Sequence, residues 1–465
     1  MRTLAIAGAG FSGTVLAANL LGSDSCRDTR IVLIERSGRF SRGIAYAPRN
    51  FPYLLNVPAE RMSARSAEPD QFLEFVRRRF ALAAGGDFVP RELYGDYLEE
   101  FLANAQAGCH ATVSLQRLSD EVLRIDPQPR GFALKLAKGD TLHADAVVLA
   151  IGNPPPSNLR ETVAAHGHPG YIGNPWTHEL EFGSTETIMT IGTGLTMADV
   201  ISAATRGTQG VARIHALSRH GLIPPTQTSF RPSVHACNTD TLKAAGDSVR
   251  KLVKTARRLS RESEFMGGDW REVVTTARLV APHIWQQLPL PQRQRFLRHV
   301  RSYWDIHRHR LPPDIRAGIE ALQSTGKLQV HAGRLTSVRP QGTRLAVSFH
   351  PRAQASVKTV LVDKLINCTG PDYAPHRSRD PLIRSLFEQG IILPDELRLG
   401  IRTGPHRNVL DSQRRTVPGL FLLGPMLRAD HWEATAANEL RNHAEDLALH
   451  LSASLNDRDT PTRPS

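Results

Sequence analysis

The chain has 465 residues, 40% of them hydrophobic, and 58 Lys and Arg residues against 45 Asp and Glu residues give a formal net charge of +13. This length predicts two or three domains with sizeable cores, which excludes an intrinsically disordered chain. The basic residues form short scattered clusters, and no apolar window reaches about 18 residues, so we expect neither a nucleic-acid nor a membrane partner. An anionic cofactor and an anionic substrate explain the charge more economically.

The first predicted unit is a strand, a glycine-rich turn, a helix and a second strand. It consists, in chain order, of an apolar run from the second residue, Gly8, Gly10, Gly13, a helix over residues 14–21, an apolar run over residues 31–34, and Glu35. In a dinucleotide-binding βαβ unit these glycines permit the tight turn, the approach of a pyrophosphate and the close packing of the helix, and the acid binds a ribose. The pattern predicts a nucleotide site; the alternative is a tight turn without a ligand.

The next segments are predicted as additions to this unit. Residues from about 66 to 106 form a helical insert, because their apolar residues recur at helical spacing. Residues 112–142 alternate like a β-meander, and the strand over residues 145–152 ends at Gly152 and brings the chain back to the cofactor domain.

The same pattern of strand, glycine turn, helix and strand recurs in the middle of the chain. A strand from residue 187 leads to Gly192 and Gly194, but Met197 replaces the third glycine. Ser218 and Arg219 stand at the end of the following strand, where a basic residue accommodates a 2′-phosphate and therefore favours NADPH over NADH. The alternative is an exposed arginine of a turn. A second helical insert, at about residues 241–325, is interrupted by Pro282, Pro289 and Pro312.

The last third of the chain is expected to return to the first domain. Strands over residues 362–370 and 419–424 end at Gly370 and Gly424, and a helix from about residue 434 to 451 follows. The predicted fold class is α/β, with two Rossmann-like domains and with β-meander and helical inserts. The predicted boundaries are residues 1–184 for the first part of the first dinucleotide-binding domain, 185–327 for the second dinucleotide-binding domain, 328–455 for the return part of the first, and 456–465 for a flexible tail.

The chain resembles the two-dinucleotide-binding flavoproteins over nearly its whole length. The resemblance extends to a bacterial group that contains FAD-dependent urate hydroxylases and aspartate N-monooxygenases. It is carried by residues 8–13, 42–46, 54–59, 62–63, 150–156, 191–199, 217–224, 304–310, 367–370, 423–425 and 432–433. The resemblance implies that FAD binds at Gly8, Gly10, Ser12, Gly13 and Glu35, with Asn56 and Gly424 near the flavin. It implies that NAD(P)H binds at Gly192, Gly194, Thr196 and Arg219.

Two nucleotide sites in one chain suggest a bound flavin that NAD(P)H reduces. The four cysteines, Cys26, Cys109, Cys237 and Cys368, lie far apart without a C-x-x-C motif, so neither a metal site nor a redox dithiol is expected. Reduced thiols are consistent with the cytoplasm. The expected acceptor is O2, through a flavin C4a-hydroperoxide that hydroxylates a substrate kept away from water.

The substrate is expected to be a small, polar, anionic nitrogen compound. Arg308, Arg310, Arg428 and His431 are the candidate substrate-binding residues, and Glu433 and His307 are the candidates for managing a substrate proton. The alternatives are a solvated arginine face and a simple helix cap at Glu433.

The preferred hypothesis is a urate hydroxylase that forms 5-hydroxyisourate in purine catabolism. The alternative is an amino-acid (aspartate-type) N-monooxygenase. Hypotheses of other classes are a non-enzymatic redox-sensing flavoprotein and a simple oxidase or diaphorase.

Overall fold

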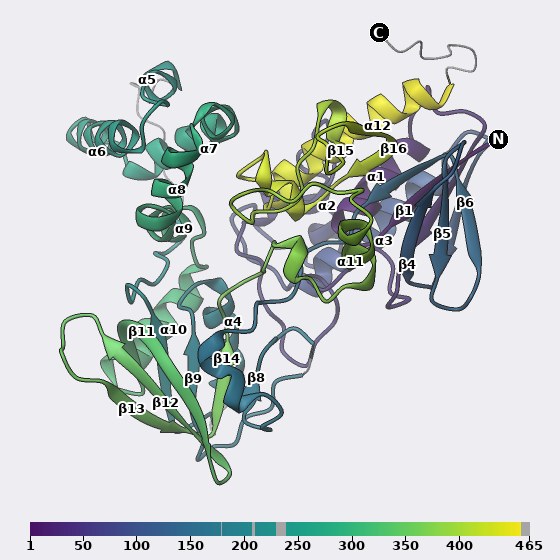
Figure 1. Cartoon of the computed structure of the whole chain (residues 1–465). Helices are drawn as coiled ribbons and strands as arrows, with labels where there is room; N and C mark the ends of the chain where they lie inside the picture. Colours follow the sequence, from purple (N-terminus) through teal and green to yellow (C-terminus); the bar gives the residue numbers. More distant parts are fainter. Residues whose placement is uncertain (178, 207–209, 229–238, 457–465) are drawn as a thin grey trace. The chain divides into compact units, whose positions relative to one another are not determined.

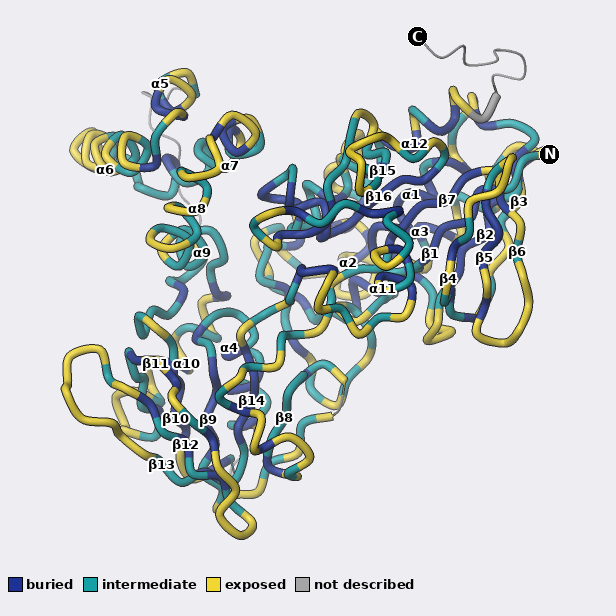
Figure 2. Tube along the Cα trace, viewed as in Figure 1, coloured by how far each residue is buried: buried dark blue, intermediate teal, exposed yellow. Residues whose placement is uncertain are grey.

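The computed structural model describes residues 1–177, 179–206, 210–228 and 239–456 (Figure 1). The chain divides into two compact units. Met1–Pro48, Pro58–Pro154 and Tyr373–Ser465 form the first unit, and Arg49–Val57 and Pro155–Asp372 form the second. Each unit has its own large sheet, and Figure 2 shows the central strands of each sheet as buried.

The first unit is built on a six-stranded sheet in the order β15-β16-β7-β1-β2-β3. Its strands are β1 (Arg2–Ala7), β2 (Thr29–Ile34), β3 (Val113–Leu118), β7 (Ala146–Leu149), β15 (Asn408–Leu410) and β16 (Thr416–Leu422). All neighbours are parallel except β15 and β16. The apolar runs of β1 and β2 are buried, as expected for strands covered on both faces.

Helices and a small second sheet complete this unit. The helices are α1 (Phe11–Leu21), α2 (Gln71–Arg79), α3 (Arg91–Ala107), α11 (Pro381–Glu388) and α12 (Ala437–Asn456), with short 3-10 helices η1 (Ala59–Arg61), η3 (Pro375–Arg377), η4 (Pro405–Arg407) and η5 (Pro425–Ala429). The small sheet holds β4 (Val122–Pro127), β5 (Phe132–Leu136) and β6 (Thr141–Ala144). Helix α1 packs between α12 and α3, and α11 packs on β4.

Two expectations for this unit need correction. Helix α1 begins at Phe11 rather than at residue 14, so that Gly13 lies inside its first turn. The segment expected to be a β-meander divides, because β3 pairs in parallel with β2 in the main sheet and only β4, β5 and β6 form the meander. The helices α2 and α3 occupy the expected insert.

The second unit is built on a seven-stranded sheet in the order β13-β12-β11-β10-β9-β14-β8. Its strands are β8 (Tyr171–Ile172), β9 (Thr187–Ile191), β10 (Arg213–Ser218), β11 (Leu328–Gln341), β12 (Arg344–Pro351), β13 (Lys358–Val362) and β14 (Lys364–Asn367). The neighbouring strands β11, β10, β9, β14 and β8 are parallel to one another. Strand β12 pairs antiparallel with β11 and with β13. The helices α4 (Leu195–Ala204) and α10 (Pro313–Ser324) pack on each other, and η2 (Arg160–Ala165) lies against β11.

The structure corrects the expected return of the chain at residue 328. Strand β11 pairs with β10 along its first half and with β12 along its second half, and β14 inserts between β9 and β8. Strands β11, β12, β13 and β14 therefore all belong to the second unit. The chain returns to the first unit at Tyr373. The first part of the first unit ends at Pro154 rather than at residue 184.

The second helical insert connects β10 to β11. It contains α5 (Thr239–Ala244), α6 (Val249–Phe265), α7 (Trp270–Gln287), α8 (Leu290–His299) and α9 (Arg301–Arg308). Pro289 and Pro312 precede α8 and α10, as expected, but α7 continues through Pro282. Pro282 removes one backbone donor from α7 but does not end the helix. Among the described residues, no helix combines the length and apolar character that a membrane span requires.

Candidate functional site

The glycine turn of the first unit has no room for larger residues at two positions. Gly8 has a φ of 107°, and a Cβ there would lie 2.3 Å from the carbonyl oxygen of Ala150. A Cβ on Gly13 would lie 2.0 Å from the carbonyl oxygen of Gly8. Gly10 differs, because its Cβ would meet only Gly43, at 3.5 Å or more. No side chain caps the helix α1 that follows, so its N-terminus is available to an anion.

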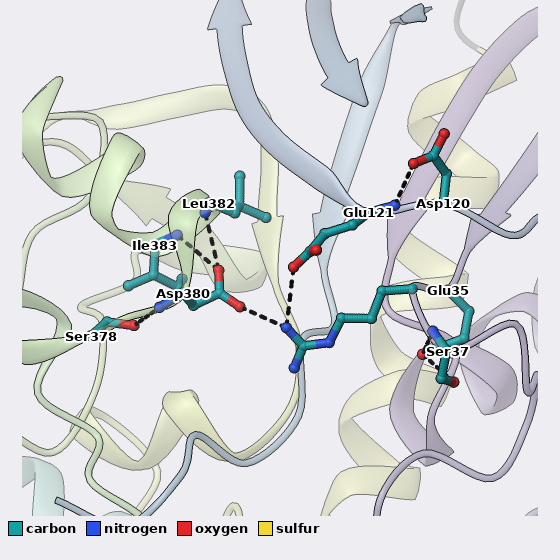
Figure 3. A network of polar contacts seen from close by, with 9 residues as sticks. Glu35, Ser37, Asp120, Glu121, Ser378, Asp380, Leu382 and Ile383 are labelled. Carbon is teal, nitrogen blue, oxygen red and sulfur yellow. Dashed lines mark hydrogen bonds and ion pairs between the residues drawn. The ribbon is translucent and has the colours of Figure 1, made fainter. Parts of the chain in front are cut away.

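The carboxylate of Glu35 closes this turn from the end of β2. Its Oε2 accepts a hydrogen bond of 3.1 Å from the backbone N–H of Ala9, and its Oε1 accepts bonds from the N–H and hydroxyl of Ser37 at 3.0 and 2.7 Å (Figure 3). The next residue, Arg36, pairs with Glu121 at 3.2 Å and with Asp380 at 3.3 Å. Glu35 is therefore fixed beside the glycine turn, where a ribose-binding acid is required.

Gly424 completes the edge of the sheet beside this turn. It follows β16 with a φ of 116°, and a Cβ on it would lie 3.7 Å from the hydroxyl of Ser12 in α1. Ser12 is buried, at 6% exposure. Gly152, with a φ of 75°, follows β7 in the same sheet. The predicted residues Gly8, Ser12 and Gly424 thus meet at one edge of the first unit.

A cavity that the sequence did not reveal lies beyond Glu35. It has a volume of about 480 Å³ and is lined by Gly38, Arg39, Phe40, Ser41, Arg42, Pro48, Glu99 and Arg117. Arg42 pairs with Asp96 and Glu99 of α3 at 2.5 and 2.6 Å. Arg117, one position before the end of β3, is the residue from which the cavity could have been predicted. That prediction would have required knowing that β3 joins the main sheet.

The second unit repeats the construction of the first. Gly192 has a φ of 108°, and its Cβ would lie 2.3 Å from the carbonyl oxygen of Cys368, as that of Gly8 would from Ala150. Asp363 accepts a bond of 2.7 Å from the N–H of Thr187, at the start of β9. In the first unit, Asp145 likewise accepts a hydrogen bond of 2.7 Å from the backbone N–H of Thr3 in β1.

The helix after the second turn begins at Leu195, with Gly194 as its N-cap. A Cβ on Gly194 would meet nothing within 4 Å, and Thr196 is half-buried in the first helical turn. Met197 is fully buried in the core of the unit. Gly370, with a φ of 84°, follows β14 in this second sheet rather than in the first.

Positive charge gathers at the carboxyl end of β10. Arg219 is exposed, and the guanidinium of Arg352 donates to Nδ1 of His220 at 2.9 Å. Burial, then Arg352 and Arg219, lower the pKa of His220, which keeps its imidazole neutral as an acceptor. The hydroxyl of Thr193 donates to that of Ser218 at 2.9 Å, which fixes the strand end. Arg352 was missed by the sequence analysis, because it comes from the loop after β12.

The predicted catalytic and substrate residues divide between the two units. The first unit contains Arg428, His431 and Glu433, and the second contains His307, Arg308 and Arg310 at and after the end of α9. Asn56 also belongs to the second unit, in the segment 49–57. The roles of these residues therefore stay predictions.

The group in the first unit is buried around η5. Glu433 is 4% exposed, and the guanidinium of Arg428 lies 3.9 Å from the ring centroid of Trp432. Burial lowers the pKa of His431, with a further contribution from the charge of Arg407. His431 is therefore neutral near pH 7 and able to accept a proton.

In the second unit, Nδ1 of His307 lies 2.7 Å from the carbonyl oxygen of Tyr303. Because a carbonyl only accepts, Nδ1 donates, and Nε2 of His307 is left as the basic nitrogen of the neutral ring. The ring also contacts Trp270 edge-on at 5.0 Å.

Comparison with known proteins bears on the first unit and on the fold. A family model described as FAD-NAD(P)-binding matches residues 5–154, so this part of the chain is similar to that family. No curated protein sequence matches the chain.

Solved structures match the whole fold at low sequence identity. L-lysine 6-monooxygenase from Pseudomonas syringae has a TM-score of 0.63 at 15% identity and covers 98% of this chain and 100% of its own. The FAD-bound cadaverine monooxygenase from Erwinia amylovora has a TM-score of 0.62 at 13% identity, with 100% and 98% coverage. Ornithine N-hydroxylase from Kutzneria sp. 744, with reduced FAD, NADP+ and L-ornithine, has a TM-score of 0.61 at 15% identity, with 98% and 99% coverage. The chain therefore shares the fold of these three monooxygenases.

Proposed function

We propose that the protein is an FAD-dependent, NADPH-consuming monooxygenase that hydroxylates the primary amine of an amino acid or a diamine. This is the N-monooxygenase alternative of the sequence analysis, and it replaces urate as the preferred substrate. The support comes from the three structural neighbours, which are monooxygenases of lysine, cadaverine and ornithine. Each of these compounds has a primary amine. No observation in the structure favours a purine.

The observation that carries the proposal is the repetition of one glycine turn in two units. Gly10 and Gly194 both precede a helix N-terminus, where a diphosphate binds; a Cβ on Gly194 would meet nothing within 4 Å, and one on Gly10 would contact only Gly43. Bound FAD would supply an acceptor for the hydride of the nicotinamide and the activation of O2. The chain's own contribution is to hold one dinucleotide in each unit. Glu35 and the cavity lined by Arg39 and Arg117 serve the adenosine half of FAD.

The charges at the end of β10 support NADPH as the reductant. Arg219 and Arg352 bring two guanidinium groups to His220, and the 2′-phosphate of NADPH is the anion expected at this strand end. NADH lacks the 2′-phosphate, so these guanidinium groups would strengthen the binding of NADPH and not that of NADH.

A dithiol acceptor has no support in the structure. Cys26, Cys109 and Cys368 are free cysteines, and burial raises the pKa of the Cys26 and Cys368 thiols, which disfavours the reactive thiolate. Cys237 lies outside the described residues. Oxygen therefore stays the proposed acceptor.

For the substrate, the buried group of the first unit offers the chemistry that an amine requires. An ammonium group must lose a proton before its nitrogen becomes nucleophilic, and neutral His431 is able to accept that proton. Arg428, whose guanidinium lies over the ring of Trp432, is the residue that we propose for a substrate carboxylate. Glu433, His307, Arg308 and Arg310 remain candidates for the same tasks.

The proposal is tested by NADPH oxidation and product analysis with L-ornithine, L-lysine, cadaverine, L-aspartate and urate. We expect one of the amines to accelerate NADPH oxidation and to yield an equivalent amount of hydroxylamine product. Conversion of urate to 5-hydroxyisourate would contradict the proposal. Stoichiometric hydrogen peroxide with every compound would identify an oxidase, and bound FAD without turnover would identify a redox sensor.

A further inference from the structure

We infer that the outer face of α6 is a docking surface for membranes that contain anionic phospholipids. Arg250, Lys254, Arg257 and Arg261 are all exposed and recur at intervals of four, three and four residues. At 3.6 residues per turn these positions fall on one line along the helix, over about 16 Å. This stripe, called the cationic stripe below, escaped the sequence analysis, which found only scattered basic clusters.

The cationic stripe keeps a net positive charge. Asp247, which precedes α6, pairs with Lys251 at 2.7 Å, and Glu262 pairs with Arg258 at 2.7 Å, both on the flank of the stripe. In the described part of the chain, no ion pair joins a stripe residue to a carboxylate. Glu264 follows Arg261 by three residues and is the one acid on the line of the four cations, at the C-terminal end of α6. A row of unneutralised cations attracts an anionic surface.

An apolar side chain extends the same line beyond the cations. Phe265 follows Arg261 by four residues and is 89% exposed, and Met266, the C-cap residue that follows it, is 54% exposed. They lead into a turn at Gly267, which has a φ of 77° and connects to α7. Exposed aromatic and apolar residues next to Lys and Arg are typical of surfaces that lie on the headgroup region of a bilayer. An acidic protein or a nucleic acid would leave Met266 without a comparable partner.

The opposite face of α6 holds the stripe in its orientation. Leu252, Val253 and Leu259 are half-buried on that face, and α6 packs on α7, α5 and α8. Figure 2 shows α6 as largely exposed on its remaining surface. The helix therefore presents its cations outward while it stays part of the helical insert, and the contact is peripheral rather than a membrane span. This differs from the expectation that the chain has no membrane partner.

The test is co-sedimentation of the FAD-loaded protein with phosphatidylcholine vesicles, with and without phosphatidylserine. We expect binding to the vesicles that contain phosphatidylserine only, and loss of that binding at high salt. The variant that neutralises the stripe carries R250Q, K254Q, R257Q and R261Q. It should lower the partition coefficient about tenfold or more, because each surface cation contributes to the attraction. The variant F265S/M266S should weaken binding and leave its salt dependence unchanged.

A matched control removes four exposed cations elsewhere and carries R130Q, K135Q, R339Q and K358Q. It has the same net charge as the stripe variant and should bind vesicles like the wild type. FAD content and NADPH oxidation should be the same in all variants, which shows that they are folded. Equal binding of the stripe variant and the control would overturn the inference. So would wild-type binding to heparin or single-stranded DNA without binding to vesicles.

Discussion

Replacing His215 by Asn is expected to make the second unit less sensitive to acid. His215 on β10 is 4% exposed, and its Nδ1 lies 3.0 Å from Nε2 of His331 on β11. The two rings are nearly parallel, at 5.2 Å and 21°, and Phe349 contacts the ring of His331. One nitrogen of this contact donates and the other accepts, which requires at least one neutral ring. An Asn side chain places an amide near the position of Nδ1 and removes the titration.

The magnitude follows from the pKa of His215. Burial, then the charges of His331, Lys358 and Arg213, lower this pKa from 6.5 to about 4. The unfolded chain therefore binds more protons than the folded chain between these values, and the free energy of unfolding falls as the pH drops through 6.5 toward 4. Since one pKa unit corresponds to about 1.4 kcal/mol, His215 alone removes about 3 kcal/mol over this interval.

The assay is urea unfolding above pH 6.5 and near pH 4, followed by far-UV circular dichroism. His299, which is exposed on α8, supplies the matched control His299→Asn, which should follow the wild type. If His215→Asn and the wild type lost the same free energy of unfolding between the two pH values, the argument from the buried pair would be refuted.

Four further predictions concern the dinucleotide sites. Gly13→Ala should lower the stability of the first unit by about 1–3 kcal/mol in thermal unfolding, because its Cβ meets the Gly8 carbonyl at 2.0 Å. Gly10→Ala should leave the melting temperature nearly unchanged but reduce the FAD content, and an equal FAD content would contradict the assigned diphosphate site. Glu35→Gln should weaken FAD binding about tenfold in a titration followed by flavin fluorescence, through the loss of ribose contacts. Arg219→Ala and Arg352→Ala should each lower the ratio of kcat/KM for NADPH to that for NADH about tenfold, and an unchanged ratio would remove that residue from the phosphate site.

Local patterns allowed the sequence to predict much of this fold. Both glycine turns, their helices, Glu35 and the two helical inserts were found from short stretches of chain, because turn chemistry and periodicity depend on near neighbours. The expectation that Gly424 lies near the flavin stays a prediction. No residue pattern in the sequence distinguished an amine substrate from urate.

The amino-acid sequence by itself determined the two glycine turns, because Gly8 and Gly192 combine a positive φ with a backbone carbonyl that leaves no room for a Cβ. Only the tertiary structure decided which strands serve which turn. It assigned β11 to β14 to the second sheet, added β3 to the first, and brought Arg352 to His220 across 132 residues of sequence. Such pairings depend on contacts between distant segments, which the period of a strand does not encode.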